Sequence, residues 1–197
     1  MQLLSAQDVA IERGERRLLS GVHLTVEAGD IWQLMGANGV GKTSLLRALA
    51  GLAQLGVSGQ IVHKQARLYL GHAPALKKSL SALDNLRCHP ASDILASDEM
   101  IFSALESLNL AGYEEQPVGS LSAGQQRRVA LTRLLLSQAP LWLLDEPFTA
   151  LDVSGCDWLD TQIRSHVSSG GAVVYTSHQP SRFGSLQQDV DLVRYVC

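Results

Sequence analysis

Residues 36–43, with the sequence GANGVGKT, match the pattern G-x-x-x-x-G-K-[ST] without a gap. Glycines at three of these positions permit backbone angles that side chains forbid, so that successive N–H groups can turn toward one anion. Lys42 adds a mobile positive charge, and the Thr43 hydroxyl is of a type that binds Mg²⁺ beside a phosphate. The pattern predicts a site for nucleotide phosphates, formed by Gly36, Ala37, Asn38, Gly39, Val40, Gly41, Lys42, Thr43 and Ser44.

Acidic and imidazole side chains suited to the same chemistry follow two apolar runs. Asp145 and Glu146 come directly after the run 141–144, and His178 follows the run 172–176. We predict that Asp145 binds Mg²⁺ together with Thr43, that Glu146 polarises the attacking water as general base, and that His178 contacts the γ-phosphate. A lone Asp-Glu pair is usually a turn, and a lone histidine is usually structural. The phosphate loop favours the catalytic interpretation.

A second stretch suited to anion binding is 121–126, with the sequence LSAGQQ. Ser122 and Gly124 stand at a predicted helix start, where free N–H groups and the helix dipole favour a negative charge. The sequence has no second phosphate loop, so we expect this helix start to address a nucleotide held by another molecule. An ordinary helix cap remains the alternative.

An α/β architecture is required to bring these stretches together. Loose alternation and glycines over the first thirty residues indicate short antiparallel strands, and apolar runs predict strands at 31–35, 57–62, 67–71, 141–144 and 172–176. Helices are expected over 44–50, 122–136 and 154–168, a loop over 88–97, and an edge strand over 190–196. Ligands of such sheets bind at the carboxyl ends of strands, so the phosphate loop, Asp145, Glu146 and His178 should converge.

Composition limits the classes of function. The 197 residues are 46% hydrophobic and carry a net charge of −3, which is typical of one globular domain and argues against a nucleic-acid partner. We expect no membrane span and no secretory signal. Three scattered cysteines, Cys88, Cys156 and Cys197, favour free thiols in a reducing compartment over disulfides or a zinc site.

Taken together, the motifs resemble those of the nucleotide-binding subunits of ATP-binding-cassette transporters, over essentially the whole chain. The resemblance implies a P-loop NTPase fold with a RecA-like parallel-sheet core, an N-terminal antiparallel β subdomain and an inserted helical subdomain, the core spanning about 1–71 and 139–197 and the helical part 72–138. It implies ATP and Mg²⁺, and a homodimer in which each ATP lies between one phosphate loop and the partner's signature. That signature aligns with Leu121, Ser122, Ala123, Gly124 and Gln125, with Ala123 where glycine is usual.

The same resemblance assigns further roles and exposes two departures. Asp152 aligns with the loop that signals between subunits, and His178 with the switch histidine. Arg13 stands where most cassettes place an aromatic residue under adenine, and His72 stands at the glutamine of the Q-loop. An arginine plane can still stack on adenine.

Within the family, the chain is most similar to the small ATP-binding subunits of cytochrome c maturation. This implies a peripheral ATPase on the cytoplasmic face of the cell membrane, attached to integral membrane subunits and serving haem delivery. No Cys-x-x-Cys-His motif indicates haem contact, and Cys88-His89-Pro90 is interpreted as incidental. Two alternatives stay open, namely a soluble cassette ATPase acting on DNA or ribosomes and a catalytically inactive nucleotide-binding regulator.

Overall fold

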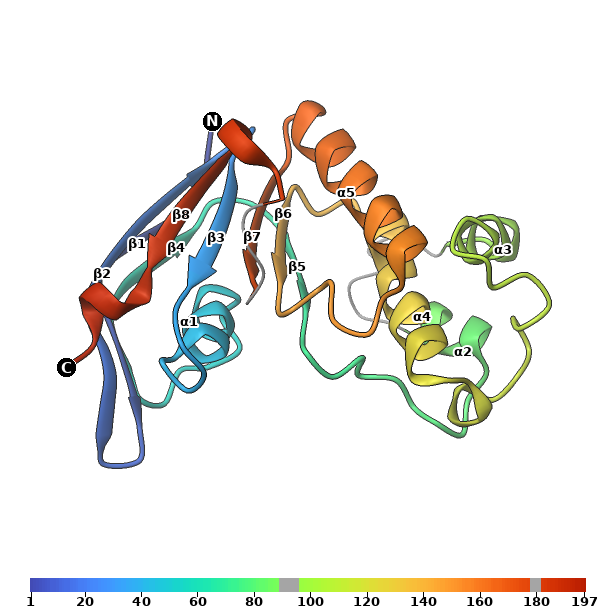
Figure 1. Cartoon of the computed structure of the whole chain (residues 1–197), viewed down its shortest axis with the longest axis horizontal. Helices are drawn as coiled ribbons and strands as arrows, with labels where there is room; N and C mark the ends of the chain where they lie inside the picture. Colours follow the sequence, from blue (N-terminus) through green and yellow to red (C-terminus); the bar gives the residue numbers. More distant parts are fainter. Residues whose placement is uncertain (89–95, 178–181) are drawn as a thin grey trace. The chain divides into compact units, whose positions relative to one another are not determined.

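The computed structural model describes residues 1–88, 96–177 and 182–197, which divide into two units (Figure 1). The first unit holds 1–72, 139–147 and 162–197, and the second holds 73–138 and 148–161. These bounds differ from the predicted ones, because His72 groups with the first unit and the segment 148–161 groups with the helices of the second.

An antiparallel sheet in the first unit is built from β1 (Gln2–Arg13), β2 (Arg16–Glu27) and β4 (Val57–His63), in the order β2-β1-β4. A two-residue turn joins β1 to β2 and opposes Arg13 to Arg16. Alternate residues of β2, among them Leu24 and Val26, are buried while Thr25 is exposed, as expected of a sheet with one face on a core. The predicted N-terminal antiparallel region is therefore confirmed.

A parallel sheet in the same unit has the order β5-β6-β7-β3-β8. Its strands are β3 (Ile31–Met35), β5 (Arg67–Leu70), β6 (Leu141–Leu144), β7 (Ala172–Thr176) and β8 (Gln187–Asp191). Every residue of β6 and β7 is buried, which explains their continuous apolar sequences. Helix α1 (Lys42–Leu49) follows β3 and buries Leu45, Leu46 and Leu49 in the same core as Leu143 and Val174.

The predicted edge strand over 190–196 was wrong in its bounds. The edge strand β8 ends at Asp191, and Leu192–Tyr195 forms the short helix η3. The Asp191 side chain accepts a hydrogen bond from the N–H of Val193 at 3.0 Å, which turns the chain out of the sheet. Another short helix, η2 (Gly184–Leu186), precedes β8.

The second unit is helical. It contains α2 (Ala82–Arg87), α3 (Asp98–Glu106), the turn η1 (Val118–Ser120) and α4 (Ala123–Leu136), together with the first part of α5 (Val153–Ser168). Ser81, Ser97 and Ser122 precede α2, α3 and α4, and each side chain accepts a hydrogen bond from the third N–H of its helix. The loop predicted over 88–97 falls mostly outside the described residues. Within the described ranges, no helix is both long and apolar enough to cross a membrane.

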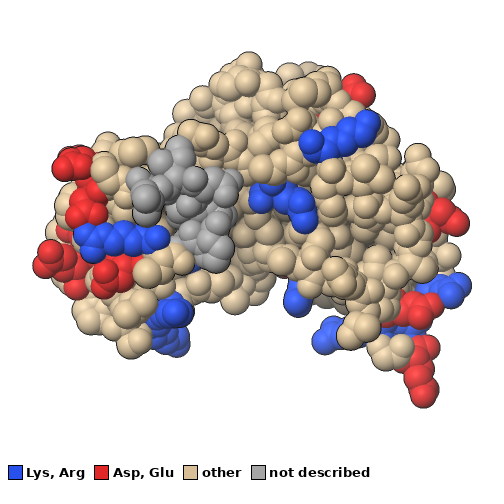
Figure 2. Space-filling view, turned by 180° about the vertical axis from the view of Figure 1, so that it is seen from behind, with Lys and Arg blue, Asp and Glu red and all other residues tan. Residues whose placement is uncertain are grey.

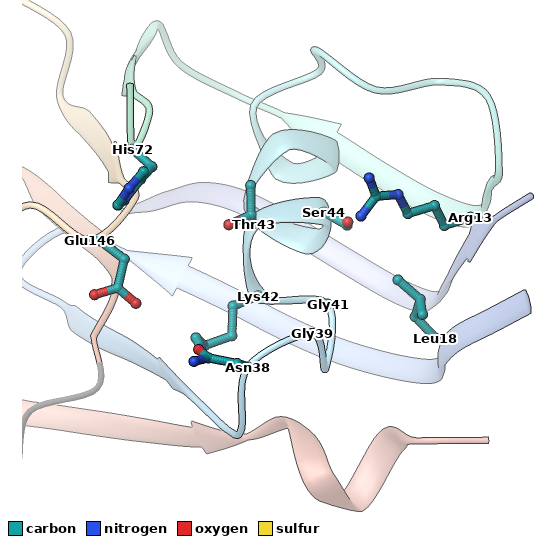
Figure 3. A pocket seen from close by; sticks show the side chains of 10 residues that line it. All are labelled: Arg13, Leu18, Asn38, Gly39, Gly41, Lys42, Thr43, Ser44, His72 and Glu146. Atoms are coloured by element: carbon teal, nitrogen blue, oxygen red, sulfur yellow. The ribbon is translucent and has the colours of Figure 1, made fainter. Parts of the chain in front are cut away.

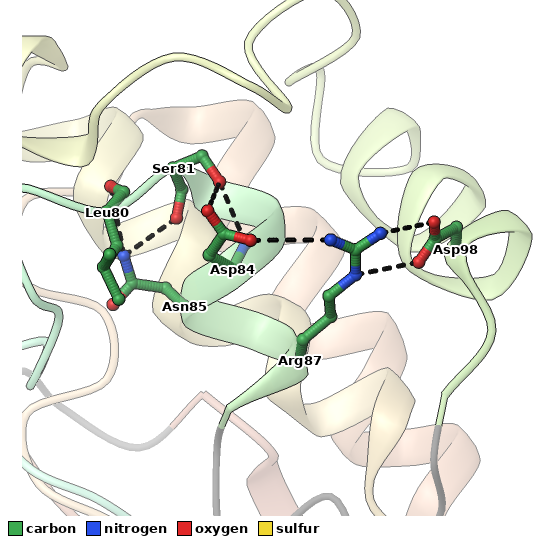
Figure 4. A network of polar contacts seen from close by, with 6 residues as sticks. All are labelled: Leu80, Ser81, Asp84, Asn85, Arg87 and Asp98. Carbon is green, nitrogen blue, oxygen red and sulfur yellow. Dashed lines mark hydrogen bonds and ion pairs between the residues drawn. The ribbon is translucent and has the colours of Figure 1, made fainter.

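Polar contacts link α2 to the loop before it and to α3 (Figure 4). The buried amide of Asn85 donates to the carbonyls of Lys77 and Ser81 at 3.0 and 2.8 Å and accepts from the N–H of Lys77 at 2.7 Å. Arg87 donates from Nε to Asp98 Oδ1 at 2.9 Å and forms an ion pair with the same carboxylate, which joins α2 to α3. One amide therefore fixes the loop before α2, and one guanidinium fixes the helix that follows it.

Candidate functional site

The phosphate loop leaves β3 and enters α1 through two glycines that no other residue can replace without strain. Gly36 has φ of +143°, and a Cβ there would lie 2.8 Å from Val40 Cγ1. Gly41 is the N-cap of α1 with φ of +117°, and its Cβ would lie 3.1 Å from Leu19 Cδ1. The loop is therefore shaped by backbone angles and close packing that only glycine permits.

Lys42 is the first residue of α1, and its ammonium group folds back over the loop. Nζ donates to the carbonyl oxygens of Gly36 at 2.7 Å and Ala37 at 3.3 Å. Burial lowers the pKa of Lys42, and the charges of Glu146 and Asp145 oppose that shift. A partly buried cation thus lies against the loop, where a phosphate group could replace the carbonyls as its partner.

Asp145 follows β6 and is 1% exposed. Its carboxylate accepts hydrogen bonds from the Thr43 hydroxyl, 3.0 Å from each oxygen, and from the Thr176 hydroxyl, 2.8 Å from Oδ1. The Thr43 and Asp145 oxygens are hard donors held next to the phosphate loop, which is the donor set that Mg²⁺ prefers. The residues present therefore fit a Mg²⁺ ion.

Glu146 begins the turn after β6 in a left-handed conformation, with φ of +49°. Its N–H donates to the Thr176 hydroxyl at 2.8 Å. Its side chain lines a pocket of about 310 Å³ together with Arg13, Leu18, Asn38, Gly39, Gly41, Lys42, Thr43, Ser44 and His72 (Figure 3). The structure thus brings the phosphate loop and the acidic pair together within the first unit.

The pocket has distinct ends. Figure 3 shows Glu146 and His72 on one side of Lys42 and Thr43, and Arg13 and Leu18 on the other. Leu18 was not predicted to line the pocket, because an apolar residue in a β-strand is usually there to pack in the hydrophobic core. His178 lies outside the described residues, so its predicted contact with the γ-phosphate stays a prediction.

The signature stretch forms the start of α4 in the second unit. Ser122 and Gln125 form a reciprocal capping box, with distances of 3.2 and 2.9 Å between side-chain oxygens and backbone nitrogens. The N–H groups of Ala123 and Gly124 belong to the first turn, where no acceptor exists within a helix. A Cβ on Gly124 would lie 3.3 Å from the Ala150 carbonyl oxygen, so the start of α4 packs closely against the loop that precedes α5.

Two arginines of α4 bind loops of the second unit. Arg128 Nη2 contacts both carboxylate oxygens of Asp152, at 2.6 and 2.7 Å, and this guanidinium lowers the pKa of Asp152. Asp152 also accepts from the N–H of Gly155 at 3.0 Å, which caps α5. Arg133 is 5% exposed and donates to the carbonyls of Pro74 at 2.9 Å and Ala75 at 3.1 Å, and burial lowers its pKa to about 10.

A protein-family model described as ABC transporter matches residues 19–149, which is more than half of the chain. The chain belongs to the ABC transporter family. Its similarity to individual members of the ABC transporter family extends further. It is 44% identical, over 96% of its length and 92% of the relative's, to the cytochrome c biogenesis ATP-binding export protein CcmA of Saccharophagus degradans. It is 45% identical, over 91% of each chain, to the protein of the same name from Escherichia coli strain K12.

Solved ABC structures share the fold. A putative ABC transporter ATP-binding protein from Pyrococcus furiosus superposes with a TM-score of 0.82 at 24% identity, covering 98% of this chain and 99% of that one. A dimeric post-hydrolysis structure of the ATP-binding cassette MJ0796, bound to ADP and Pi, superposes with a TM-score of 0.80 at 21% identity, covering 90% and 88%. At these identities the likeness establishes the fold of the ABC ATPase.

Proposed function

We propose that this ABC protein is the ATP-hydrolysing subunit of a membrane complex of cytochrome c biogenesis, concerned with haem export or handling. The observation that carries the proposal is that Thr43 and Glu146 line one pocket with the phosphate loop, while the buried Asp145 carboxylate accepts the Thr43 hydroxyl beside it. The name shared by relatives 44% to 45% identical over nearly the whole chain supports the biological setting.

The residues of the pocket divide the reaction between them. The N–H groups of the phosphate loop and of the α1 start bind the β- and γ-phosphates of ATP, and Lys42 neutralises their charge. Thr43 and Asp145 would hold Mg²⁺, which would supply positive charge to offset the charge that develops on the phosphate groups. Glu146 accepts the proton of the attacking water. Arg13 stacks on the adenine at the far end of the pocket, and His72 takes the Q-loop position near Glu146.

A second copy of the chain completes each site. The N–H groups of Ala123 and Gly124 in the first turn of α4, together with the helix dipole, suit the γ-phosphate of an ATP held by the partner, and Ser122 caps the same helix start. Asp152, directly before α5, takes the role of the loop that signals between subunits, and His178, which follows β7 in the sequence, contacts the γ-phosphate. The dimer solved for MJ0796 supports this arrangement as an analogy of fold.

The membrane partners are integral subunits of the CcmB type, together with CcmC-like subunits, and the complex lies on the cytoplasmic face of the cell membrane.

The competing function, a cassette ATPase acting on DNA or ribosomes, needs a basic surface. The net charge is −3. On the face shown in Figure 2, Lys and Arg side chains are scattered with Asp and Glu, and the described residues form no continuous basic patch there.

The proposal is tested by isolating the tagged protein from detergent-solubilised membranes. We expect integral cytochrome c maturation subunits to co-purify and the complex to hydrolyse Mg²⁺-ATP, with hydrolysis lost in Lys42→Ala. Co-purification of ribosomes or DNA in place of membrane subunits would contradict the biological setting. Undiminished hydrolysis in Lys42→Ala would contradict the assignment of the site.

A further inference from the structure

Thr176 lies between the two segments that carry the proposed chemistry. It is the last residue of β7, which lies between β6 and β3 in the parallel sheet. Its register partner is Leu34 of β3, and its side chain is fully buried. On one side the chain leaves the sheet at Asp145, and on the other it leaves toward the phosphate loop. The residue therefore occupies the carboxyl edge at the centre of the site.

The Thr176 hydroxyl makes one hydrogen bond as donor and another as acceptor. It donates to Asp145 Oδ1 and accepts from the Glu146 N–H, both at 2.8 Å. A hydroxyl has one proton and two lone pairs, so both bonds can exist together. Valine has nearly the same shape and no polar atom to satisfy, and an unbonded buried hydroxyl is unfavourable. Packing alone would favour valine here, whereas the two bonds require a hydroxyl.

The bond to Glu146 acts on the backbone at the point where the strand ends. The N–H of Asp145 still bonds the Leu70 carbonyl in the sheet, at 2.8 Å, whereas the next N–H bonds the Thr176 hydroxyl. Glu146 itself has φ of +49°, a conformation that non-glycine residues adopt only when their surroundings hold them there. The hydroxyl thus sets the direction in which the Glu146 side chain leaves the sheet.

The bond to Asp145 is independent of the phosphate loop. Thr43 also donates to this carboxylate, but Thr43 is itself a proposed Mg²⁺ ligand. Thr176 belongs to β7, has no exposure to solvent and bonds the carboxylate from within the sheet. It is therefore a donor that can hold Asp145 in one orientation whether or not the Thr43 oxygen is engaged.

From these contacts we propose that Thr176 is a positioning residue for ATP hydrolysis, whose single hydroxyl fixes the Asp145 carboxylate and the Glu146 backbone relative to each other. The inference rests on the proposed roles of Asp145 and Glu146. It predicts that a β-branched side chain without the hydroxyl fills the position and fails in function, and that serine, which keeps the hydroxyl, restores it.

The first test needs no catalysis. Amide hydrogen exchange at Glu146 is measured in the purified nucleotide-free chain for wild type, Thr176→Val and Thr176→Ser. We expect exchange about tenfold faster in Thr176→Val and near the wild-type rate in Thr176→Ser, since loss of a buried bond is typically worth a factor of this size. A wild-type exchange rate in Thr176→Val would overturn the inference. Should that variant not fold, Thr176→Ala replaces it with the same expected result.

A matched control is available in the second unit. Thr132 is also fully buried, and its hydroxyl donates to the Arg128 carbonyl at 3.0 Å. Thr132→Val therefore removes a comparable hydroxyl without touching Asp145 or Glu146. We expect it to leave exchange at Glu146 unchanged, which separates a local effect of Thr176 from a general loss of stability.

The second test measures ATP turnover of the assembled complex against Mg²⁺ concentration. Thr176→Val should lower kcat by about tenfold or more and raise the half-saturating Mg²⁺ concentration, and Thr176→Ser should restore both. Unchanged kinetics in Thr176→Val, with Glu146→Gln inactive, would overturn this inference and leave the proposed function intact. Wild-type turnover in Glu146→Gln would overturn the proposed role of Glu146, and the exchange experiment would still decide the contact of Thr176.

Discussion

The two units fix their functional loops with different chemical groups. In the first unit, the hydroxyls of Thr43 and Thr176 bond the buried carboxylate of Asp145. In the second, the guanidinium groups of Arg128 and Arg133 bond the Asp152 carboxylate and the carbonyls of Pro74 and Ala75. One unit therefore orients a carboxylate with neutral donors, and the other ties loops to a helix with charged ones.

The difference follows from what each group can do. A hydroxyl is short, donates and accepts at once, and leaves the negative charge of a carboxylate available to a cation. A guanidinium only donates, reaches across several ångströms and neutralises the charge it meets. Hydroxyls therefore suit a site proposed to bind Mg²⁺, and arginines suit contacts that hold α4 and its loops together.

The largest effect should come from Glu146, because the proposed chemistry lies in the first unit. Glu146→Gln removes the proposed general base and should lower turnover of the assembled complex by at least about 100-fold while ATP still binds. Turnover by phosphate release and ATP affinity by equilibrium binding check the two parts. Equal rates for the variant and wild type would move the general base elsewhere.

Arg133→Met should remove the contact by which a guanidinium of α4 holds a loop in the second unit. The substitution keeps an apolar stem but leaves the Pro74 and Ala75 carbonyls without their buried donor, and we expect the free energy of unfolding to fall by about 1–3 kcal/mol. Chemical denaturation of the purified chain measures this. Arg194→Met, at an exposed position, is the matched control and should change little. A neutral result for Arg133→Met would show that the contact is not structural.

Arg13→Ala should weaken ATP binding by about two- to fivefold, as expected for a cation–π contact at an exposed position. Arg13→Tyr should restore the affinity, since an aromatic ring can stack on adenine as well. Titration calorimetry of the chain with ATP measures both variants. Unchanged affinity in Arg13→Ala would make Arg13 an ordinary residue of the β1–β2 hairpin.

The smallest effects should appear in the pH dependence of stability, and they should differ between the units. His166 in the first unit stacks on Trp142, with ring centroids 3.7 Å apart, and burial lowers its pKa. The unfolded chain then binds the proton more tightly, so stability should fall as the pH drops below about 6.5, the usual value for histidine. His166→Phe should remove this loss.

Asp152 should respond in a more acidic range. Its pKa is lowered by Arg128, so its contribution is complete above the unfolded value of about 3.9 and is lost as the pH falls through the folded value. Melting temperatures measured from pH 7 to pH 3 should thus separate His166→Phe, which differs from wild type near pH 6, from Asp152→Asn. An effect of Asp152→Asn that varies between pH 5 and 7 would contradict the assignment.

The sequence predicted the core strands well because their local signals were strong. The runs 31–35, 141–144 and 172–176 were located to the residue, since each is apolar and precedes a motif or a polar turn. Strand β8 was misplaced because it reads QQDVD, and only Val190 in it is buried. An edge strand of this kind is specified by pairing with β3, which leaves no apolar pattern in its own sequence.

Contacts between residues far apart in the sequence are the part of the site that could not be predicted. The phosphate loop and the acidic pair were identified from motifs, and in the structure Glu146 lines the pocket of the loop while Asp145 accepts the Thr43 hydroxyl beside it. Thr176 gave no signal, because threonine is an ordinary strand residue and its partners lie 30 and 31 positions away. Arg133 likewise bonds carbonyls 58 and 59 positions earlier. Such pairings depend on tertiary structure, and no periodicity in the sequence encodes them.

The place of β3 in the parallel sheet has a consequence for how the protein is made. Ile31 at its start pairs with Val173 on one side and with Gln187 on the other. The ribosome synthesises the phosphate loop well before either neighbour of its strand, since β7 begins at Ala172 and β8 at Gln187. During synthesis the phosphate loop therefore lacks the neighbouring strands of its sheet. Pairing between strands so far apart in the sequence also forms slowly. Nascent chains stalled before residue 172 should expose apolar β3 and α1 surface to chaperones, whereas completed chains should not.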